Sequence, residues 1–275
     1  FAQGGNTPLT DVQAAWRVRA NLRAGDWSGV KSTIEAMPAA ERREPAWRYW
    51  LSRAESAAGN IEPARKLRES LLRENNFYGL LAAEESGIPA SPPWQGWKPS
   101  AADLEAAGGL RGIRRALGLY RLEMKNEGLR EWQYAIRNLN DRQLLAASEL
   151  ARTAGVPDRA INTAERTLLV HDFSQRFPMP YRSDLQAQAR AQGLEEAWVY
   201  GLIRQESRFM ADAKSRVGAA GLMQLMPATA RWAAKQVGMN ANAARNVNDV
   251  PVNLTLGAYY LRHVLDDLGH PVLAT

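Results

Sequence analysis

One glutamate occupies a position suited to acid–base chemistry. From Leu194 to Ser207 the apolar residues recur at the spacing that predicts an amphipathic helix. At about 100° per residue, Val199 and Leu202 lie about 20° and 40° from Glu206 around the helix axis, so Glu206 falls inside the apolar stripe. A partly desolvated carboxyl group favours its protonated form, which suits a proton donor. The alternative is that Glu206 is a solvated surface charge, as most helical glutamates are.

The segment that follows this helix contains paired glycines and then a proline. Gly218 and Gly221 permit a tight turn or a close approach of the backbone, and Pro227 suits the first position of a new helix. That helix is expected to stop at Gly238. We therefore expect residues 215–226 to form a compact strand-like or looped piece between two helices.

Three blocks of sequence together resemble a known family. They are Glu206-Ser207, the stretch Ser215 to Thr229 with Gly221-Leu222-Met223-Gln224-Leu225-Met226-Pro227, and Asn253-Leu254-Thr255-Leu256-Gly257-Ala258-Tyr259-Tyr260-Leu261. In this order and spacing they resemble the soluble lytic murein transglycosylases of the bacterial cell wall, whose catalytic domain is lysozyme-like and related to goose-type lysozyme. The resemblance implies an all-α chain, in which a helical superhelix, or solenoid, is followed by a lysozyme-like, α-rich catalytic domain.

The first part of the chain reads as a series of helix pairs. Gly25 and Gly59, which are 34 residues apart, lie in turn-like sequences, and further turns are expected at Asn126-Glu127-Gly128 and Thr153-Ala154-Gly155. This period predicts a helix-turn-helix solenoid. Phe177-Pro178-Met179-Pro180-Tyr181 interrupts helix twice.

We therefore predict a superhelical domain at residues 1–175 and a transglycosylase domain at residues 176–275. In the family, the sequence continues into an Ala-Tyr-Asn-Ala-Gly motif that does not occur here. We expect the second domain to be truncated at its C-terminus and this length of chain to be weakly active or inactive.

A second carboxylate is hard to assign. Glycoside cleavage usually uses two, but the carboxylates near Glu206 favour roles as surface charges or helix caps; they are Glu195, Glu196, Asp212, Asp249, Asp266 and Asp267. One acid without a partner suits a mechanism in which the substrate supplies the second group. The resemblance implies such a mechanism: one Glu, here Glu206, protonates the oxygen between N-acetylmuramic acid and N-acetylglucosamine. It then deprotonates the muramic acid 6-hydroxyl, and a 1,6-anhydro end results.

The resemblance also implies a set of substrate-binding residues. Ser215 and Gln224 match positions that hydrogen-bond the sugar, and Met226 matches an apolar wall of the groove. Ser207, Met223 and Tyr260 complete the set. For Ser207 and Met223 the alternative is packing of the catalytic helix against the glycine turn, and for Tyr260 and Met226 it is packing in the core.

The composition limits the classes of protein to which the chain can belong. The chain has 275 residues, 45% of them hydrophobic and 23% charged, which is typical of a globular protein. There are no cysteines, which excludes disulfides and Cys-ligated metals, and the three histidines show no metal-ligand spacing, so we expect no metal and no cofactor. The net charge of +6 favours an anionic partner, but it is thinly spread.

We expect peptidoglycan glycan strands as the substrate and other cell-wall enzymes as partners, with no nucleic acid and no transmembrane segment. The oligomeric state is left open. The start of the chain has no signal-peptide pattern. By itself this fits either a cytoplasmic protein or a chain whose signal peptide has been removed or trimmed, and the resemblance favours the second and hence the periplasm.

Three alternatives remain open on the sequence. A muramidase would hydrolyse the same bond, and its products would lack anhydro ends. A helical-repeat scaffold that carries an incomplete enzyme domain would bind protein without needing Glu206. A basic helical nucleic-acid binder is disfavoured, because no recognition motif and no concentrated Lys/Arg stripe is found.

Overall fold

The computed structural model describes residues 9–72, 74–88, 96–240 and 242–269. Within these ranges every regular element is a helix, which confirms the predicted all-α class. Backbone contacts divide the chain into two compact units, residues 1–94 and 95–275. The C-terminal residues 270–275, on which the expected truncation rests, lie outside the described residues.

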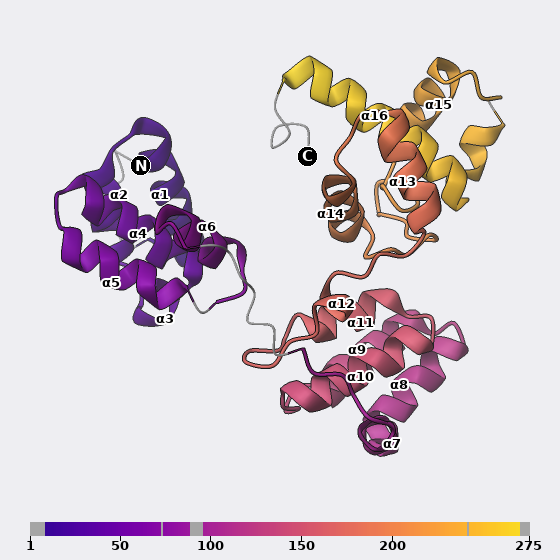
Figure 1. Ribbon diagram of the computed structural model, residues 1–275, viewed down its shortest axis with the longest axis horizontal. Coiled ribbons are helices and arrows are strands. Elements are labelled where there is room, and N and C mark those ends of the chain that lie inside the picture. The colour runs from indigo at the N-terminus through magenta and orange to yellow at the C-terminus, as the bar shows by residue number, and fades with distance from the viewer. Residues whose placement is uncertain (1–8, 73, 89–95, 241, 270–275) are drawn as a thin grey trace. The chain divides into compact units, whose positions relative to one another are not determined.

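The first unit contains short helices that pack in antiparallel pairs (Figure 1). They are α1 (Asp11–Ala24), α2 (Trp27–Glu35), α3 (Ala39–Arg42), α4 (Pro45–Ala57), α5 (Ile61–Leu71) and α6 (Phe77–Glu85). Val18, Val30 and Ile34 are fully buried where α1 and α2 meet α4. Leu71 forms a second small core with Tyr49. Apart from the short α3, which has no buried residue, these helices therefore bury apolar residues against their neighbours along the chain, as expected of a repeat array.

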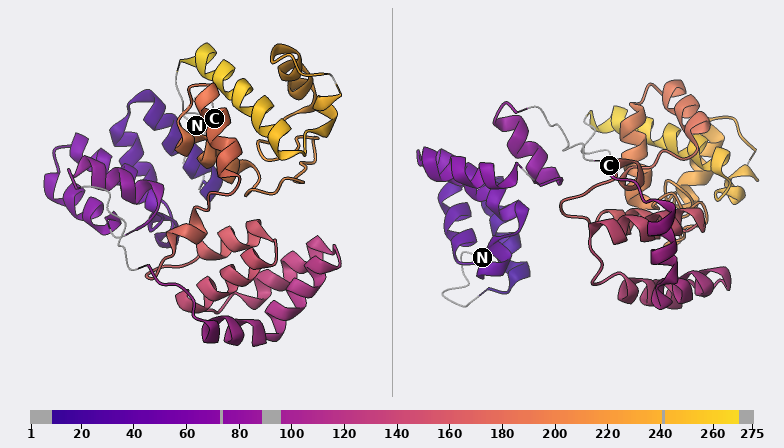
Figure 2. Two further views of the ribbon diagram at one scale, coloured as in Figure 1. Left: turned by 45° about the vertical axis from the view of Figure 1, so that its right-hand side comes forward. Right: turned by 60° about the horizontal axis from the view of Figure 1, so that its bottom comes forward.

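The second unit begins with helices of the same kind. They are α7 (Ala101–Gly109), α8 (Arg111–Arg121), α9 (Lys125–Ala135), α10 (Asp141–Thr153), α11 (Pro157–Ala164) and α12 (Phe173–Arg176), seen from two further sides in Figure 2. Trp132 is 1% exposed, and its indole N–H donates to the hydroxyl of Thr163 at 2.9 Å. This polar contact ties α9 to α11 inside the apolar core.

Three of the four predicted turns are confirmed, and one is wrong. Gly25, Gly59 and Gly155 have left-handed backbones with φ of 69°, 80° and 75° and follow α1, α4 and α10. Gly128, however, lies inside α9, where an added Cβ would stand 3.0 Å from the ring of Tyr120. The turn between α8 and α9 is made instead by Glu123, with φ of 58°.

The last part of the second unit positions the candidate site. It contains α13 (Arg182–Ala191), α14 (Glu196–Glu206), α15 (Pro227–Gln236), the short 3₁₀ helix η1 (Ala243–Asn246) and α16 (Val250–Leu268). Leu185, Ile203 and Leu254 meet in one core that also includes Ile161 of α11. Within this unit, α11 therefore shares an apolar core with α13, α14 and α16, while α15 packs with α16 in a separate core.

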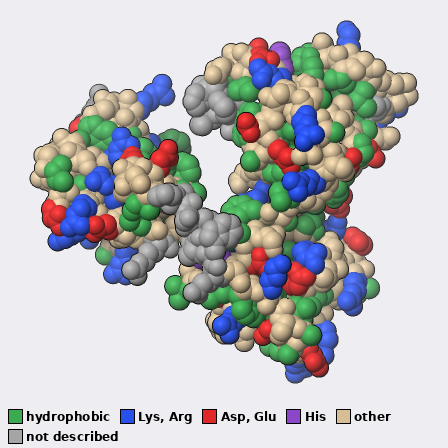
Figure 3. Space-filling view, viewed as in Figure 1, with side chains coloured by type: hydrophobic (Ala, Val, Ile, Leu, Met, Phe, Trp, Pro, Cys, Tyr) green, Lys and Arg blue, Asp and Glu red, His purple; other side chains and the backbone are tan. Residues whose placement is uncertain are grey.

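The surface shows no concentration of one charge on the face in view. Lys and Arg side chains are interspersed with Asp and Glu across that face (Figure 3). Over the described ranges, no helix has both the length and the apolar character needed to span a lipid bilayer.

Candidate active site

Glu206 is the last residue of α14. This helix is anchored by Val199, Tyr200 and Ile203, which are buried in the core. The helix stops because Arg208 and Phe209 take left-handed backbones with φ of 52° and 64°. The predicted helix is thus confirmed, but the expected burial of Glu206 is wrong, because its side chain is exposed.

The Glu206 side chain nevertheless borders a cavity of about 240 Å³. The cavity lies between the end of α14, the residues that lead into α15, and one face of α16. Its lining residues are Leu202, Glu206, Met223, Gln224, Leu225, Met226, Thr229, Gly257, Tyr260, Leu261 and Val264. Among the described residues that line it, Glu206 is the only carboxylate. The structure therefore brings Glu206 together with Gln224, Met226, Met223 and Tyr260.

The segment between α14 and α15 is looped, with single bridges in place of strands. Ala220 pairs with Lys214 on one side and Leu225 on the other. Gly221 has φ of 78°, and an added Cβ would stand 2.1 Å from Asn253 Nδ2, so only glycine fits there. The helix after it begins at Pro227 and ends before Gly238, whose φ is 70°, as predicted.

Asn253 of α16 holds this loop, a role that the sequence did not reveal. Its side chain is fully buried; Oδ1 accepts the backbone N–H of Met223 at 2.8 Å. Its Nδ2 donates to the carbonyls of Ala220 at 3.2 Å and Val247 at 2.8 Å. A polar residue on an otherwise apolar helix stripe was the only signal that could have pointed to it.

Gln224 lines the cavity but uses its amide nitrogen internally. With φ of 46°, it stands in the left-handed region. Its Nε2 donates to the carbonyl of Gly221 at 2.8 Å and to that of Ala213 at 3.1 Å. A hydrogen bond donated by this nitrogen to a sugar would therefore compete with two hydrogen bonds that hold the loop. Among the described residues no hydrogen bond reaches its Oε1, which can still accept one.

The apolar wall is formed from two directions. Met223 is buried against Gly257, where an added Cβ would stand 2.2 Å from the Met223 Sδ. This methionine therefore has a packing role, which was the alternative to substrate binding. Met226 is 41% exposed at the cavity, which fits the groove reading. Tyr260 is 37% exposed and packs edge-on against Trp232 with ring centroids 6.1 Å apart. Tyr260 also lines the cavity.

The two serines predicted to bind substrate do not line the cavity. Ser207 is buried; its hydroxyl donates to the carbonyl of Ile203 at 3.2 Å and accepts the N–H of Phe209 at 3.2 Å. Ser215 accepts the N–H of Ala219 at 2.9 Å within the glycine turn. Both side chains shape the backbone around the site, because their oxygens are engaged in turns.

The other carboxylates near α14 have the structural roles expected of them. Asp249 caps α16 by accepting the N–H of Val252 at 3.2 Å, and Asp266 pairs with Arg262. A larger cavity of about 520 Å³ contains the carboxylates of Glu123 and Asp212. Both are held by Lys125, at 3.7 Å and 2.6 Å, so neither is placed as a proton donor.

Fold and site together define an all-helical protein with a repeat array, followed by a lysozyme-like part that presents one glutamate at a cavity. Two family models match the chain: the Soluble lytic murein transglycosylase L domain over residues 108–169 and the Transglycosylase SLT domain over residues 184–275. The chain belongs to the soluble lytic murein transglycosylase family. The boundary predicted near residue 175 falls between the two matches and stays a prediction.

Curated relatives extend the similarity. The soluble lytic murein transglycosylases of Escherichia coli strain K12 and Salmonella typhimurium are each 23% identical to this chain, in alignments of 279 positions that cover 95% of it. The chain spans 43% of the length of these relatives.

Two solved structures have the same fold. One is the lytic transglycosylase Slt of Pseudomonas aeruginosa in an inactive glutamate-to-glutamine variant, with 30% identity, a TM-score of 0.77 and coverage of 94% of this chain and 42% of that one. The other is a 70-kDa soluble lytic transglycosylase in complex with bulgecin A, with 22% identity, a TM-score of 0.77 and coverage of 97% and 43%.

The described residues offer no group of three or more His, Asp or Glu side chains arranged to hold a metal ion.

Proposed function

We propose that this protein is a peptidoglycan lytic transglycosylase, and that it cleaves the β-1,4 bond between N-acetylmuramic acid and N-acetylglucosamine. The observation that carries the proposal is the cavity in which Glu206, at the end of α14, faces Gln224, Met226 and Tyr260. Family membership supports the reaction class. The inactive glutamate-to-glutamine variant of the Pseudomonas aeruginosa relative supports a glutamate as the essential group.

In this proposal Glu206 acts twice. Its protonated carboxyl group donates a proton to the glycosidic oxygen as the bond to the anomeric carbon breaks, and the N-acetylglucosamine end leaves as an alcohol. The carboxylate then takes the proton of the muramic acid 6-hydroxyl, whose oxygen bonds to the anomeric carbon. The proton returns to Glu206, no water is consumed, and the product carries a 1,6-anhydro ring. The absence of a second carboxylate among the described lining residues suits this internal nucleophile.

The exposure of Glu206 suits a polymeric substrate. A proton donor must come within hydrogen-bond distance of the glycosidic oxygen, and a long glycan strand reaches an open carboxylate more readily than a deeply enclosed one. Tyr260 and Met226 offer apolar faces to sugar rings, and Gln224 offers its Oε1 to an N–H or O–H group. We place the protein in the periplasm, with peptidoglycan strands as substrate and other cell-wall enzymes as partners.

The test is the Glu206→Gln variant of the full-length protein with purified peptidoglycan sacculi. We expect the wild type to release fragments with 1,6-anhydro ends, identified by mass spectrometry. The variant should be at least 100-fold slower, because the amide cannot donate a proton to the leaving oxygen. Circular dichroism of both proteins should be the same, since Glu206 is exposed. Reducing ends in place of anhydro ends would identify a muramidase, and an active variant would refute the role of Glu206.

A further inference from the structure

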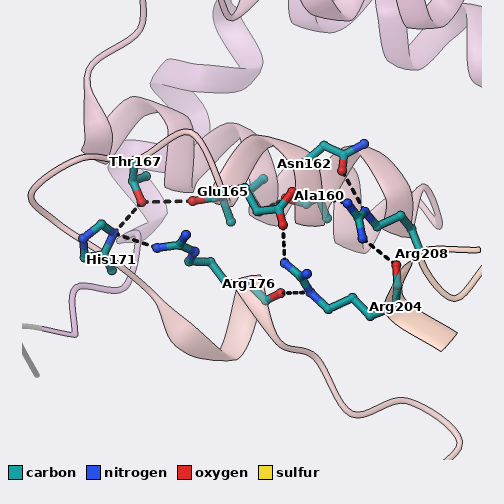
Figure 4. Close-up of polar contacts among 10 residues, drawn as sticks. Ala160, Asn162, Glu165, Thr167, His171, Arg176, Arg204 and Arg208 are labelled. Carbon is teal, nitrogen blue, oxygen red and sulfur yellow. Dashed lines mark hydrogen bonds and ion pairs between the residues drawn. The ribbon is translucent and has the colours of Figure 1, made fainter. Parts of the chain in front are cut away.

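The end of α14 is held from the side opposite Glu206. Arg204 precedes Glu206 by two residues, so its side chain leaves the helix about 200° around the axis. Its Nη2 donates to Oε1 of Glu165 at 2.5 Å, and its Nε donates to the backbone carbonyl of Arg176 at 2.8 Å (Figure 4). The Arg204 side chain is only 16% exposed. Glu165 follows α11 in the helical-repeat part of the second unit, and Arg176 is the last residue of α12.

A second arginine anchors the same helix end from two residues beyond Glu206. Nη1 of Arg208 donates to the carbonyl of Arg204 at 2.6 Å, and its Nε donates to Oδ1 of Asn162 at 3.0 Å (Figure 4). That carbonyl is one of the last four of the helix, which lack intrahelical partners. The positive charge also matches the negative end of the helix dipole. Arg208 therefore closes the helix and ties it to α11.

Glu165 is the charge that both arginines share. It stands directly after α11, with Oε1 at Arg204 and Oε2 3.7 Å from Arg208. It lies within the residues that match the L domain model and outside those that match the SLT domain model. By contrast, no ion pair or hydrogen bond involves the Glu206 carboxylate among the described residues. The place of that carboxylate therefore depends on how the helix end is held.

We propose that Glu165 is a positioning residue for Glu206, acting through Arg204 and Arg208, so that the helical-repeat part sets where the proton donor stands in the cavity. The inference rests on the proposed function. Proton transfer requires the two heavy atoms to come within about 3 Å, and a displacement of about 1 Å costs on the order of 100-fold in rate. Loss of the Glu165 charge leaves two guanidinium groups side by side without their carboxylate and releases the helix end.

The test compares Glu165→Gln with Glu131→Gln in the full-length protein. Glu131 is a matched control: it pairs with Arg115 at 2.5 Å between α8 and α9, with a side chain 23% exposed against 31% for Glu165. With soluble glycan strands as substrate, we expect Glu165→Gln to lower kcat about tenfold with KM within about twofold. Glu131→Gln should leave both constants unchanged. The two variants should have similar Tm values.

Two further variants separate positioning from folding. Glu165→Asp keeps the carboxylate and should recover part of kcat. The double variant Glu165→Gln/Arg204→Gln should be no slower than the slower single variant, because both changes break one linkage. If Glu165→Gln does not fold, Arg204→Lys takes its place. Lysine keeps the positive charge but cannot reproduce the two hydrogen bonds that the guanidinium donates from Nε and Nη2.

The inference is overturned if the wild type is active and the Glu165→Gln variant has the same kcat. It is also overturned if kcat falls only in proportion to Tm in every variant. A wild type that releases no fragments would refute the proposed function itself, which is a different outcome.

Discussion

Asn253 supports the cavity without touching it in the structure. Its amide accepts the N–H of Met223 and donates to the carbonyls of Ala220 and Val247. The Ala220 carbonyl also accepts the N–H of Leu225 at 3.0 Å. Buried polar groups that lose their partner cost about 1–3 kcal/mol each. One side chain thus fixes the loop that places Met223 and Gln224 beside Glu206.

We predict that Asn253→Ala lowers the free energy of unfolding by about 3 kcal/mol and reduces kcat/KM, because the cavity wall loses its support. Urea unfolding and the glycan assay measure the two effects. Thr255→Ala is the control: its hydroxyl donates only to the carbonyl of Pro251 in the same helix at 2.8 Å, so the loss should stay within about 0.5 kcal/mol. Equal stability of the two variants would contradict the role assigned to Asn253.

Side-chain periodicity located the glutamate but not its surroundings. Helical spacing places Glu206 among apolar residues, but those residues would bury it only if the packing continued past the last turn of the helix. In the structure the helix ends at Glu206, so the exposed carboxylate borders the cavity from its rim. Ser215 and Ser207 were assigned by resemblance, and a motif does not show that their hydroxyls are engaged in turns. The sequence therefore predicts which residues gather better than it predicts what each one contacts.

At the scale of elements, Gly257 lets α16 approach the loop after α14. No side chain fits there, because a Cβ would stand 2.2 Å from Sδ and 2.9 Å from Cβ of Met223. We predict that Gly257→Ala lowers the free energy of unfolding by about 1–2 kcal/mol, since overpacking outweighs the gain in helix propensity. It should also lower activity by shifting Met223 and Gln224.

Gly201 is a matched control for this prediction. It lies in α14, where an added Cβ meets no atom within 4 Å. Gly201→Ala should raise stability by about 0.5–1 kcal/mol through helix propensity alone. Opposite changes in Tm for the two glycine variants are expected, and a stabilised Gly257→Ala would contradict the packing argument.

Element types were predictable, but the position of one turn was not. Glycine at a turn is a strong signal because it adopts left-handed backbone without a steric cost, which is why Gly25, Gly59 and Gly155 were placed correctly. Glycine also serves close packing, and Gly128 meets Tyr120 for that reason. Sequence alone does not separate the two uses, and Glu123 occupies the left-handed position without any such signal.

At the scale of the molecule, one carboxylate joins the repeat helices to the segment that leads toward the site. Asp141, in the first turn of α10, accepts the backbone N–H groups of Leu168, Leu169 and Val170 at 3.0, 2.7 and 2.8 Å. Burial raises the pKa of the Asp141 carboxyl group, but these three donors outweigh it and hold the pKa below its ordinary value of 3.8. The carboxylate therefore stabilises the fold above that value, and the contribution is lost as the pH falls through the lower pKa of the folded state.

We predict that Asp141→Asn lowers the free energy of unfolding by about 1–2 kcal/mol at pH 7, and that the difference from wild type narrows below pH 3. Thermal unfolding at both pH values measures it. Asp184→Asn, whose carboxylate is exposed in the first turn of α13, is the control and should show a smaller effect at pH 7. A difference for Asp141→Asn that does not change with pH would show that the charge is not what stabilises the contact.

Thermostability engineering would have to avoid three positions near Glu206 that first look favourable. Arg208, Phe209 and Gln224 all adopt left-handed backbones, which cost about 1–2 kcal/mol each for side-chain-bearing residues and which glycine adopts without strain. Yet their side chains are, in turn, a guanidinium that closes a helix, a ring 3% exposed in the core and an amide that braces a loop. A glycine at any of them would relax the main chain while loosening the wall of the cleft, so stabilising substitutions are better sought on outward helix faces far from this region.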